Sequence, residues 1–385
     1  MPIVTKKGTP IKVTIKNNPP AAGTPLFPPS QFDLSMVPPA VALANSVVLH
    51  RHGGLQAAVD DGVPGPNVAP GGSRTNLYPN NQAAAPLWYH DHTDMLTSFN
   101  VYGGLAGLMP NTDTLEPGFN LPTGAFAKSY LLQDKSFNAD KTMCYTHASP
   151  EFFGDLPVIN GTIAPKQTVQ PRRYTFTFVN GSDSRVWNLT LKSTTPTGAT
   201  KAPQMTVVGS DSGYLLNPVK VNSQIIAPGE RYKVVVDFTG TKGQWVLSND
   251  AATPYPAGDP AVATVPQLMA FNVGTTLTGK DSSVIPARIT ETNNGLPSAA
   301  SLKNVRLRTV QAAEMSPGVP QLGNATTLGV PNGPATETPQ LGSTEAWAMR
   351  NHSPAMLHGC RLLDMTSGAF YPCSFGHLLV AAHTP

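Results

Sequence analysis

Four of the nine histidines stand in two pairs, each with one residue between its members. The first pair is His50-Arg-His52, and the second is His90-Asp-His92. In a β-strand, residues i and i+2 point to the same face, so each pair presents two imidazoles side by side. Imidazole is a good ligand for copper, zinc, iron and nickel. The two pairs therefore predict a transition-metal site.

Acidic residues lie close to both pairs. Asp61, Asp91 and Asp94 are candidates for orienting the ring nitrogens from outside the metal. The alternative, that they are turn or solvent-facing acids, stays open at this point. A mononuclear centre of the cupin kind would need a Glu shortly after its His-x-His pair, and residues 53–56 (GGLQ) contain none.

The elements that must carry these histidines are strands, because a period of two dominates the hydrophobic pattern. The clearest strand-like runs are 11–15, 174–179, 204–208, 232–238 and 244–247. Helical periodicity is confined to one stretch, 94–108. The chain has 34 Gly and 39 Pro in 385 residues and only 13% charged residues. Such a composition is typical of many short strands joined by turns, so the predicted fold class is all-β.

A weak internal repeat organises the chain. Three segments each contain a strand, an Asn with a turn, and a second strand. Their asparagines are Asn17, Asn180 and Asn351, and the two intervals between them are nearly equal. We therefore expect three copies of one β-sandwich unit, at 1–120, 121–275 and 276–385. The first copy opens shortly before its Asn, and the third continues only a short way after it, so we expect the third sandwich to be incomplete.

The net charge, the hydrophobic pattern and the cysteines bear on which classes of function the chain can have. Lys and Arg number 26 against 23 Asp and Glu, a net charge of +3, which argues against a nucleic-acid-binding surface. No apolar run approaches the length of a transmembrane segment, and the start of the sequence contains no apolar core of a signal peptide. Cys144, Cys360 and Cys373 share no metal-type spacing and leave the compartment open.

Both histidine motifs resemble those of a known family. The segment LWYHDHTDMLTSFNVYGGLAGLM strongly resembles the second copper motif of multicopper oxidases, particularly spore-coat laccases and bilirubin oxidases. VVLHRHGGLQAAVDDG resembles the first copper motif, and LPVINGTIAP, VVGSDSGYLL and IIAPGERYKVVVDF are similar to the middle unit. The resemblance runs from about residue 10 to about 364. It implies tandem cupredoxin-like Greek-key sandwiches in a chain truncated at both ends.

The resemblance also implies a function, with copper as the cofactor. Such enzymes couple one-electron oxidation of phenolic or related small molecules to the reduction of dioxygen to water. By position, His50 would bind type 2 copper, and His52, His90 and His92 would bind the type 3 pair. Asp61 would assist proton delivery, and the middle unit would bind no copper. The family is mainly extracellular, periplasmic or in the spore coat.

The third and fourth copper motifs depart from the family pattern. Where His-Pro-x-His-x-His is expected, the chain has Ser353, Met356 and His358, so only His358 remains as a metal-ligand candidate. The fourth motif, His-Cys-His, is absent, and the neighbours of Cys373 do not supply it. A blue copper site requires a Cys thiolate, so no type 1 site is evident. We therefore expect an impaired oxidase; the alternative is a copper-binding or metal-free cupredoxin scaffold without oxidase activity.

Overall fold

The computed structural model describes most of the chain up to residue 289 and shorter stretches beyond it. The described residues are 2–18, 31–33, 35, 37, 39–63, 67–146, 151–194, 201–260, 265–289, 305–316, 319–324, 338, 340, 344–351, 360–363, 370–373 and 379–383. They belong to two compact units, Met1–Ile289 and Thr290–Pro385. The domain boundaries expected at residues 120 and 275 stay predictions.

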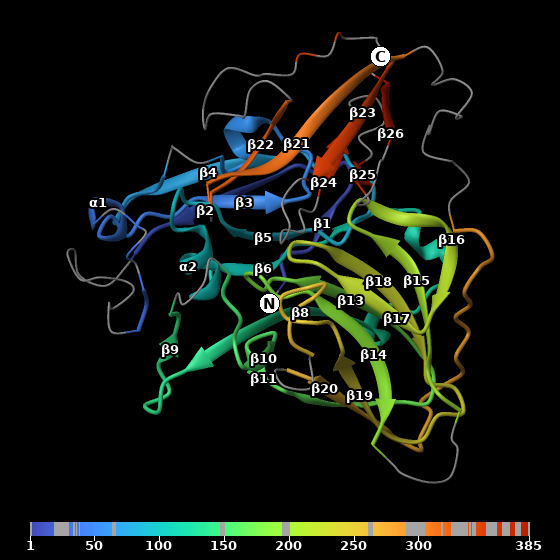
Figure 1. The fold of residues 1–385 in the computed structure, drawn as a ribbon. Coiled ribbons are helices and arrows are strands. Elements are labelled where there is room, and N and C mark those ends of the chain that lie inside the picture. The colour runs from blue at the N-terminus through green and yellow to red at the C-terminus, as the bar shows by residue number, and fades with distance from the viewer. Residues whose placement is uncertain are drawn as a thin grey trace. The chain divides into compact units, whose positions relative to one another are not determined.

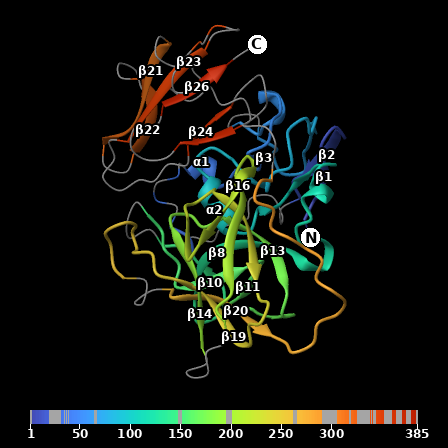
Figure 2. The same ribbon diagram turned by 90° about the vertical axis from the view of Figure 1, so that its right-hand side faces the viewer.

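Most of the first unit is a sandwich of two sheets, drawn in green and yellow in Figure 1 and seen from the side in Figure 2. One sheet has the order β11-β10-β8-β13-β18-β15-β16, with β9 paired to β8. Its strands are β8 (Ala127–Phe137), β9 (Met143–Cys144), β10 (Leu156–Ile159), β11 (Thr162–Ile163), β13 (Arg173–Asn180), β15 (Gln204–Ser210), β16 (Gly213–Val221) and β18 (Arg231–Asp237). The other has the order β12-β20-β19-β14-β17. Its strands are β12 (Lys166–Val169), β14 (Trp187–Ser193), β17 (Ser223–Ile226), β19 (Gly243–Asn249) and β20 (Gln267–Val273).

Apolar side chains of both sheets form the core of this sandwich. Phe176 of β13 stacks on Phe271 of β20 with ring centroids 5.1 Å apart, which joins the two layers. Trp187 of β14 is fully buried beside them. All five strand-like runs found in the sequence are strands here, namely β2, β13, β15, β18 and β19, with only small shifts at their ends. The period-two pattern therefore predicted these strands correctly.

The N-terminal part of the first unit contains shorter sheets. Its strands are β1 (Thr5–Lys6), β2 (Ile11–Lys16), β3 (Leu49–His52), β4 (Ser73–Tyr78), β5 (Trp88–Asp91), β6 (Ala106–Leu108) and β7 (Asn111–Thr112). They pair as β1-β7, β2-β4 and β3-β5-β6. Short helices lie between them and before β8: α1 (Pro39–Ala42), η1 (Ala58–Asp60), α2 (Thr97–Tyr102), η2 (Glu116–Phe119) and η3 (Gly124–Phe126).

The helix predicted for 94–108 is wrong at its C-terminal end. Helix α2 covers only Thr97–Tyr102, and the chain then forms strand β6, which pairs with β5. The two glycines that follow α2 explain the difference, because Gly104 takes a φ of +111°, which ends a helix without the strain that a side chain would add. Residues 106–108 then gain sheet hydrogen bonds in place of helical ones.

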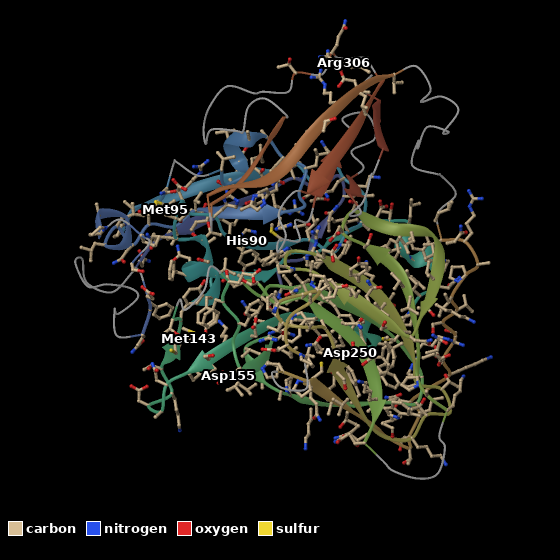
Figure 3. All side chains as sticks on the ribbon, viewed as in Figure 1. His90, Met95, Met143, Asp155, Asp250 and Arg306 are labelled. Atoms are coloured by element: carbon tan, nitrogen blue, oxygen red, sulfur yellow. The ribbon has the colours of Figure 1, made fainter. Side chains whose placement is uncertain are left out.

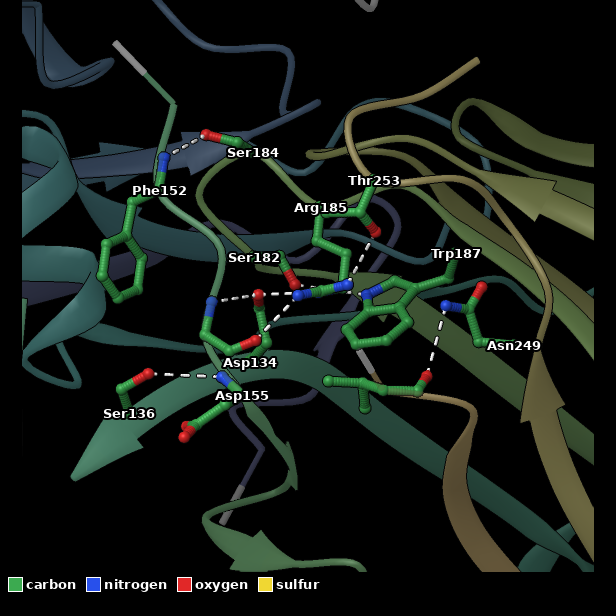
Figure 4. A network of polar contacts seen from close by, with 12 residues as sticks. Asp134, Ser136, Phe152, Asp155, Ser182, Ser184, Arg185, Trp187, Asn249 and Thr253 are labelled. Atoms are coloured by element: carbon green, nitrogen blue, oxygen red, sulfur yellow. Dashed lines mark hydrogen bonds and ion pairs between the residues drawn. The ribbon is translucent and has the colours of Figure 1, made fainter. Parts of the chain in front are cut away.

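A buried polar network fixes the entry to β14 (Figure 4). The Arg185 guanidinium forms an ion pair with Asp134 of β8 at 2.8 Å and donates to the Thr253 hydroxyl at 2.9 Å. It also donates to the carbonyl of Gly154 at 2.7 Å, and the Gly154 amide donates to Asp134 at 2.7 Å. Both charges are about 1% exposed, so each depends on the other for compensation.

The second unit also consists of strands in its described residues. One sheet has the order β22-β21-β23-β26, and β24 pairs with β25 separately. The strands are β21 (Arg306–Ser316), β22 (Val319–Asn324), β23 (Thr344–Asn351), β24 (Cys360–Leu363), β25 (Phe370–Cys373) and β26 (Leu379–His383). The strand expected before Asn351 is therefore confirmed as β23.

Candidate metal centre

The two histidine pairs lie on neighbouring antiparallel strands. The β3–β5 register sets His50 opposite His90, and His52 opposite Trp88. Because side chains alternate between the faces of a strand, His50, His52 and His90 share one face. His92 follows two positions after His90, where its amide donates to the carbonyl of Val48 at 3.0 Å. Figure 3 shows His90 among these N-terminal strands.

Four imidazole rings meet at this face. The ring centroid of His50 lies 5.7 Å from that of His52, 5.2 Å from that of His90 and 5.1 Å from that of His92. His90 lies 5.4 Å from His52 and 5.8 Å from His92. The structure thus brings together all four histidines that the sequence singled out, although the two pairs are far apart in the chain.

The donor atoms of this cluster suit a transition metal. His50, His52 and His90 each place one ring nitrogen within 4.8 Å of the other two. Nδ1 of His52 and Nε2 of His90 are 3.1 Å apart. His92 has a buried Nδ1 without a hydrogen-bond partner among the described residues. Three convergent imidazole nitrogens, with a fourth ring beside them whose Nδ1 is unsatisfied in the described part of the chain, fit copper or another imidazole-binding ion.

Backbone carbonyls orient two of the rings. Nδ1 of His50 donates to the carbonyl of Asp61 at 2.6 Å, and Nδ1 of His90 donates to the carbonyl of Asp91 at 2.7 Å. When Nδ1 carries the proton, Nε2 keeps its lone pair for a metal. The two contacts therefore select the ligand nitrogen of each ring before any metal binds.

Asp61 also contacts His50 through its carboxylate, at 3.2 Å from Nδ1. The side-chain amide of Gln56 donates to the same carboxylate. Gly62, with φ of +70°, brings this loop against β3: a Cβ at this position would lie 2.1 Å from the carbonyl oxygen of Leu49. Only glycine therefore fits the turn that places Asp61 beside His50.

Asp91 and Asp94 differ in burial and in their hydrogen bonds. The Asp91 carboxylate is buried and accepts hydrogen bonds from the amides of Val48 and Thr93 and from the side chain of Asn100, each at 2.9 Å. It fixes the ends of β3 and β5, while only its carbonyl contacts a ring. Asp94 is exposed, and the hydrogen bonds of the described residues include none between Asp94 and a histidine.

Arg51 lies between the first two histidines in sequence and points to the opposite face. It is fully buried and donates to Asn80 at 2.6 Å and to the Thr5 hydroxyl at 2.8 Å. Its guanidinium also lies over the ring of Tyr78, 5.2 Å from the centroid. Burial lowers the pKa of Arg51 to about 10, so it stays charged at neutral pH. These contacts join the back of β3 to β1 and to the loop after β4.

Burial favours the neutral form of two of the four imidazoles, His90 and His92. Desolvation and the neighbouring His50 lower the pKa of His90 to about 3. Desolvation, together with His50, also lowers the pKa of His92. Neutral imidazole is the form that binds metals, so His90 and His92 need not first lose a proton to bind one.

A cavity of about 480 Å³ opens beside the cluster. His52, Trp88 and His90 form one wall, and Pro228 and Gly229 of the large sandwich form another. The remaining lining residues are Met95, Thr97, Ser98, Val101, Ser182 and Asp183. Trp88 stacks on His52 with ring centroids 5.2 Å apart. A small molecule could therefore reach the cluster from this side.

The structure does not describe every predicted site residue. His358, Ser353 and Met356 lie outside the described residues, so their placement stays a prediction. The sequence reasoning did not find Gln56, Trp88 or Gly229. Trp88 and Gln56 adjoin the histidine motifs and could have been suspected, whereas Gly229 belongs to the middle unit, far from His52 in the chain, and carried no such signal.

Tandem β-sandwiches with a histidine cluster on the N-terminal strands define a class: all-β proteins with a candidate transition-metal centre. Two family models described as multicopper oxidase match residues 41–111 and 135–267, which together make up just over half of the chain. The laccase of Bacillus subtilis (strain 168) is 32% identical over 82% of this chain and 64% of its own length. "Multicopper oxidase LPR1 homolog 3" of Oryza sativa subsp. japonica is 32% identical over 91% of this chain and 70% of its own.

The chain belongs to the multicopper oxidase family. The crystal structure of the McoA multicopper oxidase from Aquifex aeolicus has a TM-score of 0.73 at 21% identity and covers 99% of this chain and 80% of that one. This likeness confirms the all-β, cupredoxin-like fold class. The chain spans 64%, 54% and 62% of the first three curated relatives that it matches. No described helix has the length and apolar character to cross a membrane.

Proposed function

We propose that this chain is a laccase-like oxidase in which His50, His52, His90 and His92 hold copper. One observation carries the proposal: the β3–β5 register gathers four imidazole rings whose centroids lie 5.1–5.8 Å from their neighbours in the cluster. A metal-free fold gains nothing from burying Nδ1 of His92 without a hydrogen-bond partner among the described residues, because an unsatisfied buried nitrogen costs desolvation energy. Membership of the multicopper oxidase family supports copper as the metal.

By position in the family motifs, His50 would bind type 2 copper, and His52, His90 and His92 would bind the type 3 pair. Bound copper would supply one-electron transfer to dioxygen, with a phenolic or related small molecule as the electron donor. The chain itself orients the ligands. The Asp61 and Asp91 carbonyls hold the Nδ1 protons of His50 and His90 at 2.6 and 2.7 Å.

Asp61 would act as the proton carrier of the centre. Its carboxylate is about one-third exposed and lies 3.2 Å from His50 Nδ1, so it touches both solvent and the cluster. Gln56 donates to the same carboxylate and keeps it at this place. A group in that position can take up protons from water and release them beside the metal ligands.

We further propose that the 385-residue chain oxidises phenols poorly. Ser353 and Met356 occupy positions where the family motif has metal ligands, and the printed sequence contains no His-Cys-His motif. A blue copper site needs a Cys thiolate, so this sequence shows no ligand set for the copper that would accept electrons from the phenol. The same observation favours a second candidate, a copper-binding cupredoxin protein without oxidase activity.

Copper content and oxygen consumption test these proposals together. The whole chain is loaded with copper, and bound copper per chain is measured for the unsubstituted protein, His90→Ala and His147→Ala. His147 lies in neither pair and serves as the control. We expect His90→Ala alone to lose copper. Equal copper in all three proteins would refute the assigned ligands.

Oxygen consumption with a phenolic donor then separates the two candidates. Slow consumption that His90→Ala abolishes supports the impaired oxidase. Copper binding with no consumption at all supports the binding protein instead. Turnover comparable to an intact laccase would show that electrons enter without a Cys-ligated copper, and the proposed impairment would be wrong.

A further inference from the structure

The large sandwich touches one of the proposed ligands directly. The turn between β17 and β18, residues 227–230, reaches the cluster, and Gly229 abuts the ring of His52. We propose that Gly229 is a positioning residue, which sets the place of the His52 ring and thereby the copper affinity of the centre. This inference rests on the proposed role of His52 as a copper ligand.

The geometry leaves no space for a side chain at position 229. A Cβ there would lie 2.9 Å from Cε1 of His52 and 3.4 Å from its Nε2. Carbon atoms do not approach so closely without displacement, so either the ring or the turn must move. Trp88 stacks against the same ring with centroids 5.2 Å apart, which limits the directions open to it. The ring is therefore confined by two different parts of the unit.

Hydrogen bonds hold the turn in place. The Gly229 amide donates to the carbonyl of Asn180 at 2.8 Å, and the Asn180 amide donates to the carbonyl of Glu230 at 3.1 Å. Within the turn, the Glu230 carboxylate accepts from the Ala227 amide at 2.8 Å. Asn180 is the asparagine of the sequence repeat, and its side-chain amide donates to the carbonyls of Ile226 and Arg185. A displaced turn would break several of these bonds.

Arg231 joins the same turn to the strand that carries His90. Its guanidinium is fully buried, lies 3.1 Å from the Asp211 carboxylate and donates to the Gly229 carbonyl at 3.1 Å. Its Nε donates to the carbonyl of Pro86, just before β5, at 3.0 Å. The turn and the start of β5 are thus held by one side chain, so a Cβ at position 229 would displace His52 rather than the turn.

Displacement of His52 would disturb the ligand set. Nδ1 of His52 lies 3.1 Å from Nε2 of His90, and both residues belong to the group with convergent ring nitrogens. Metal affinity depends on ligand positions, and loss of a group that orients a ligand lowers affinity by about 10–100-fold. We expect Gly229→Ala to weaken copper binding by about 10-fold or more, by the same reasoning.

A second glycine provides a matched control. Gly161, in the turn between β10 and β11, has the same φ of +82°, but a Cβ there would meet no atom within 4 Å. Gly161→Ala therefore adds the same left-handed backbone strain without the contact to a ligand. The Cu²⁺ dissociation constant is measured for both variants by competition with a chromophoric chelator. The unfolding midpoint of each metal-free protein is measured in urea.

We expect both variants to lose stability, and only Gly229→Ala to lose copper affinity. Equal affinities in the two variants would overturn the inference. Because Asn adopts a left-handed conformation more readily than Ala, Gly229→Asn keeps the Cβ with less backbone strain, and it replaces Gly229→Ala if that variant fails to fold.

A double substitution assigns the effect to His52. In a His52→Ala background, Gly229→Ala should cause no further loss of copper affinity, because the ring that it displaces is gone. A full further loss would show that Gly229 acts elsewhere and would also overturn the inference. Failure of the proposed function looks different: the unsubstituted chain and His52→Ala would then bind copper with equal affinity.

Discussion

At the scale of single residues, the candidate centre depends on backbone oxygens more than on acidic side chains. The sequence suggested that Asp61 and Asp91 orient the ring nitrogens, and both do so through their carbonyls. The Asp91 carboxylate instead accepts hydrogen bonds from the amides of Val48, just before β3, and Thr93, after β5. Only Asp61 adds a carboxylate contact, at 3.2 Å from Nδ1 of His50, so residue type did not predict which atom of Asp91 makes the contact.

Gly62 offers a residue-scale test of how Asp61 reaches His50. A Cβ there would meet the carbonyl of Leu49 at 2.1 Å, at a φ of +70°. Backbone cannot give way as a side-chain tip can, so Gly62→Ala should cost more than the ~1–3 kcal/mol of left-handed strain alone and should weaken copper binding. Gly71→Ala is the control, with φ of +78° and no atom within 4 Å. Urea unfolding that ranks the two variants equally would contradict the predicted clash.

Lys135 supplies a prediction on pH. It is 6% exposed, its ammonium donates to the carbonyl of Tyr102, and burial lowers its pKa to about 8 from 10.5. Between these two pH values the unfolded chain binds the proton and the folded chain does not, so the free energy of unfolding rises with pH across this window. The slope approaches about 1.4 kcal/mol per pH unit. Below about pH 8 the contribution of Lys135 to the free energy of unfolding does not change with pH.

The measurement compares the unsubstituted protein with Lys135→Met at several pH values between 7 and 11. The difference in free energy of unfolding between the two should be flat up to about pH 8 and should then change in favour of the unsubstituted protein. Other titrating groups cancel in the difference. A flat difference throughout would mean that the Lys135 ammonium is solvated in the folded protein.

At the scale of elements, strand register creates the site. The sequence predicts that each His-x-His pair shares a strand face, since this follows from the period of two. It does not predict that His50 stands opposite His90, because register depends on the pairing of β3 with β5, two segments far apart in the chain. The helix predicted at 94–108 was too long for a related reason: residues 106–108 pair with β5, and local periodicity carries no information on such a partner.

The Asp134–Arg185 pair ties β8 to the start of β14, and its loss should be costly. Arg185→Met leaves the Asp134 carboxylate buried without its cation, with an expected cost of about 3–5 kcal/mol in the free energy of unfolding. Asp134→Leu combined with Arg185→Met should cost less than the single change, because no charge is left uncompensated. Both are measured by urea unfolding.

An exposed ion pair gives the matched comparison. Lys192 and Asp250 lie 3.7 Å apart with side chains 58% and 47% exposed. Lys192→Met should change stability by less than about 1 kcal/mol, because water solvates the remaining charge. A loss as large as that of Arg185→Met would show that burial does not set the energy of these pairs.

At the scale of the whole molecule, the short N-terminal sheets and the large sandwich of the first unit meet at the candidate centre. The repeat of Asn17 and Asn180 predicted separate units, and the structure shows that Asn180 also supports the turn that reaches His52. A sequence repeat predicts the fold of each copy, but it does not predict which residues of one copy contact the next. The sequence did not predict a role for Gly229 for this reason: its role depends on a contact with His52, which lies in the preceding copy of the repeat.

Copper should therefore stabilise the first unit as a whole. The proposed ligands lie on β3, on β5 and directly after β5, and the turn at Gly229 connects them to the large sandwich, so unfolding of either part should release the metal. Copper at about 100 times its dissociation constant should add about 2.7 kcal/mol to the free energy of unfolding. Urea unfolding with and without Cu²⁺ measures this gain, and His90→Ala should abolish most of it. A gain of the same size in His90→Ala would place the stabilising copper outside the histidine cluster, whereas a gain lost in both His90→Ala and Gly229→Ala would tie metal binding to the contact between the two sandwiches.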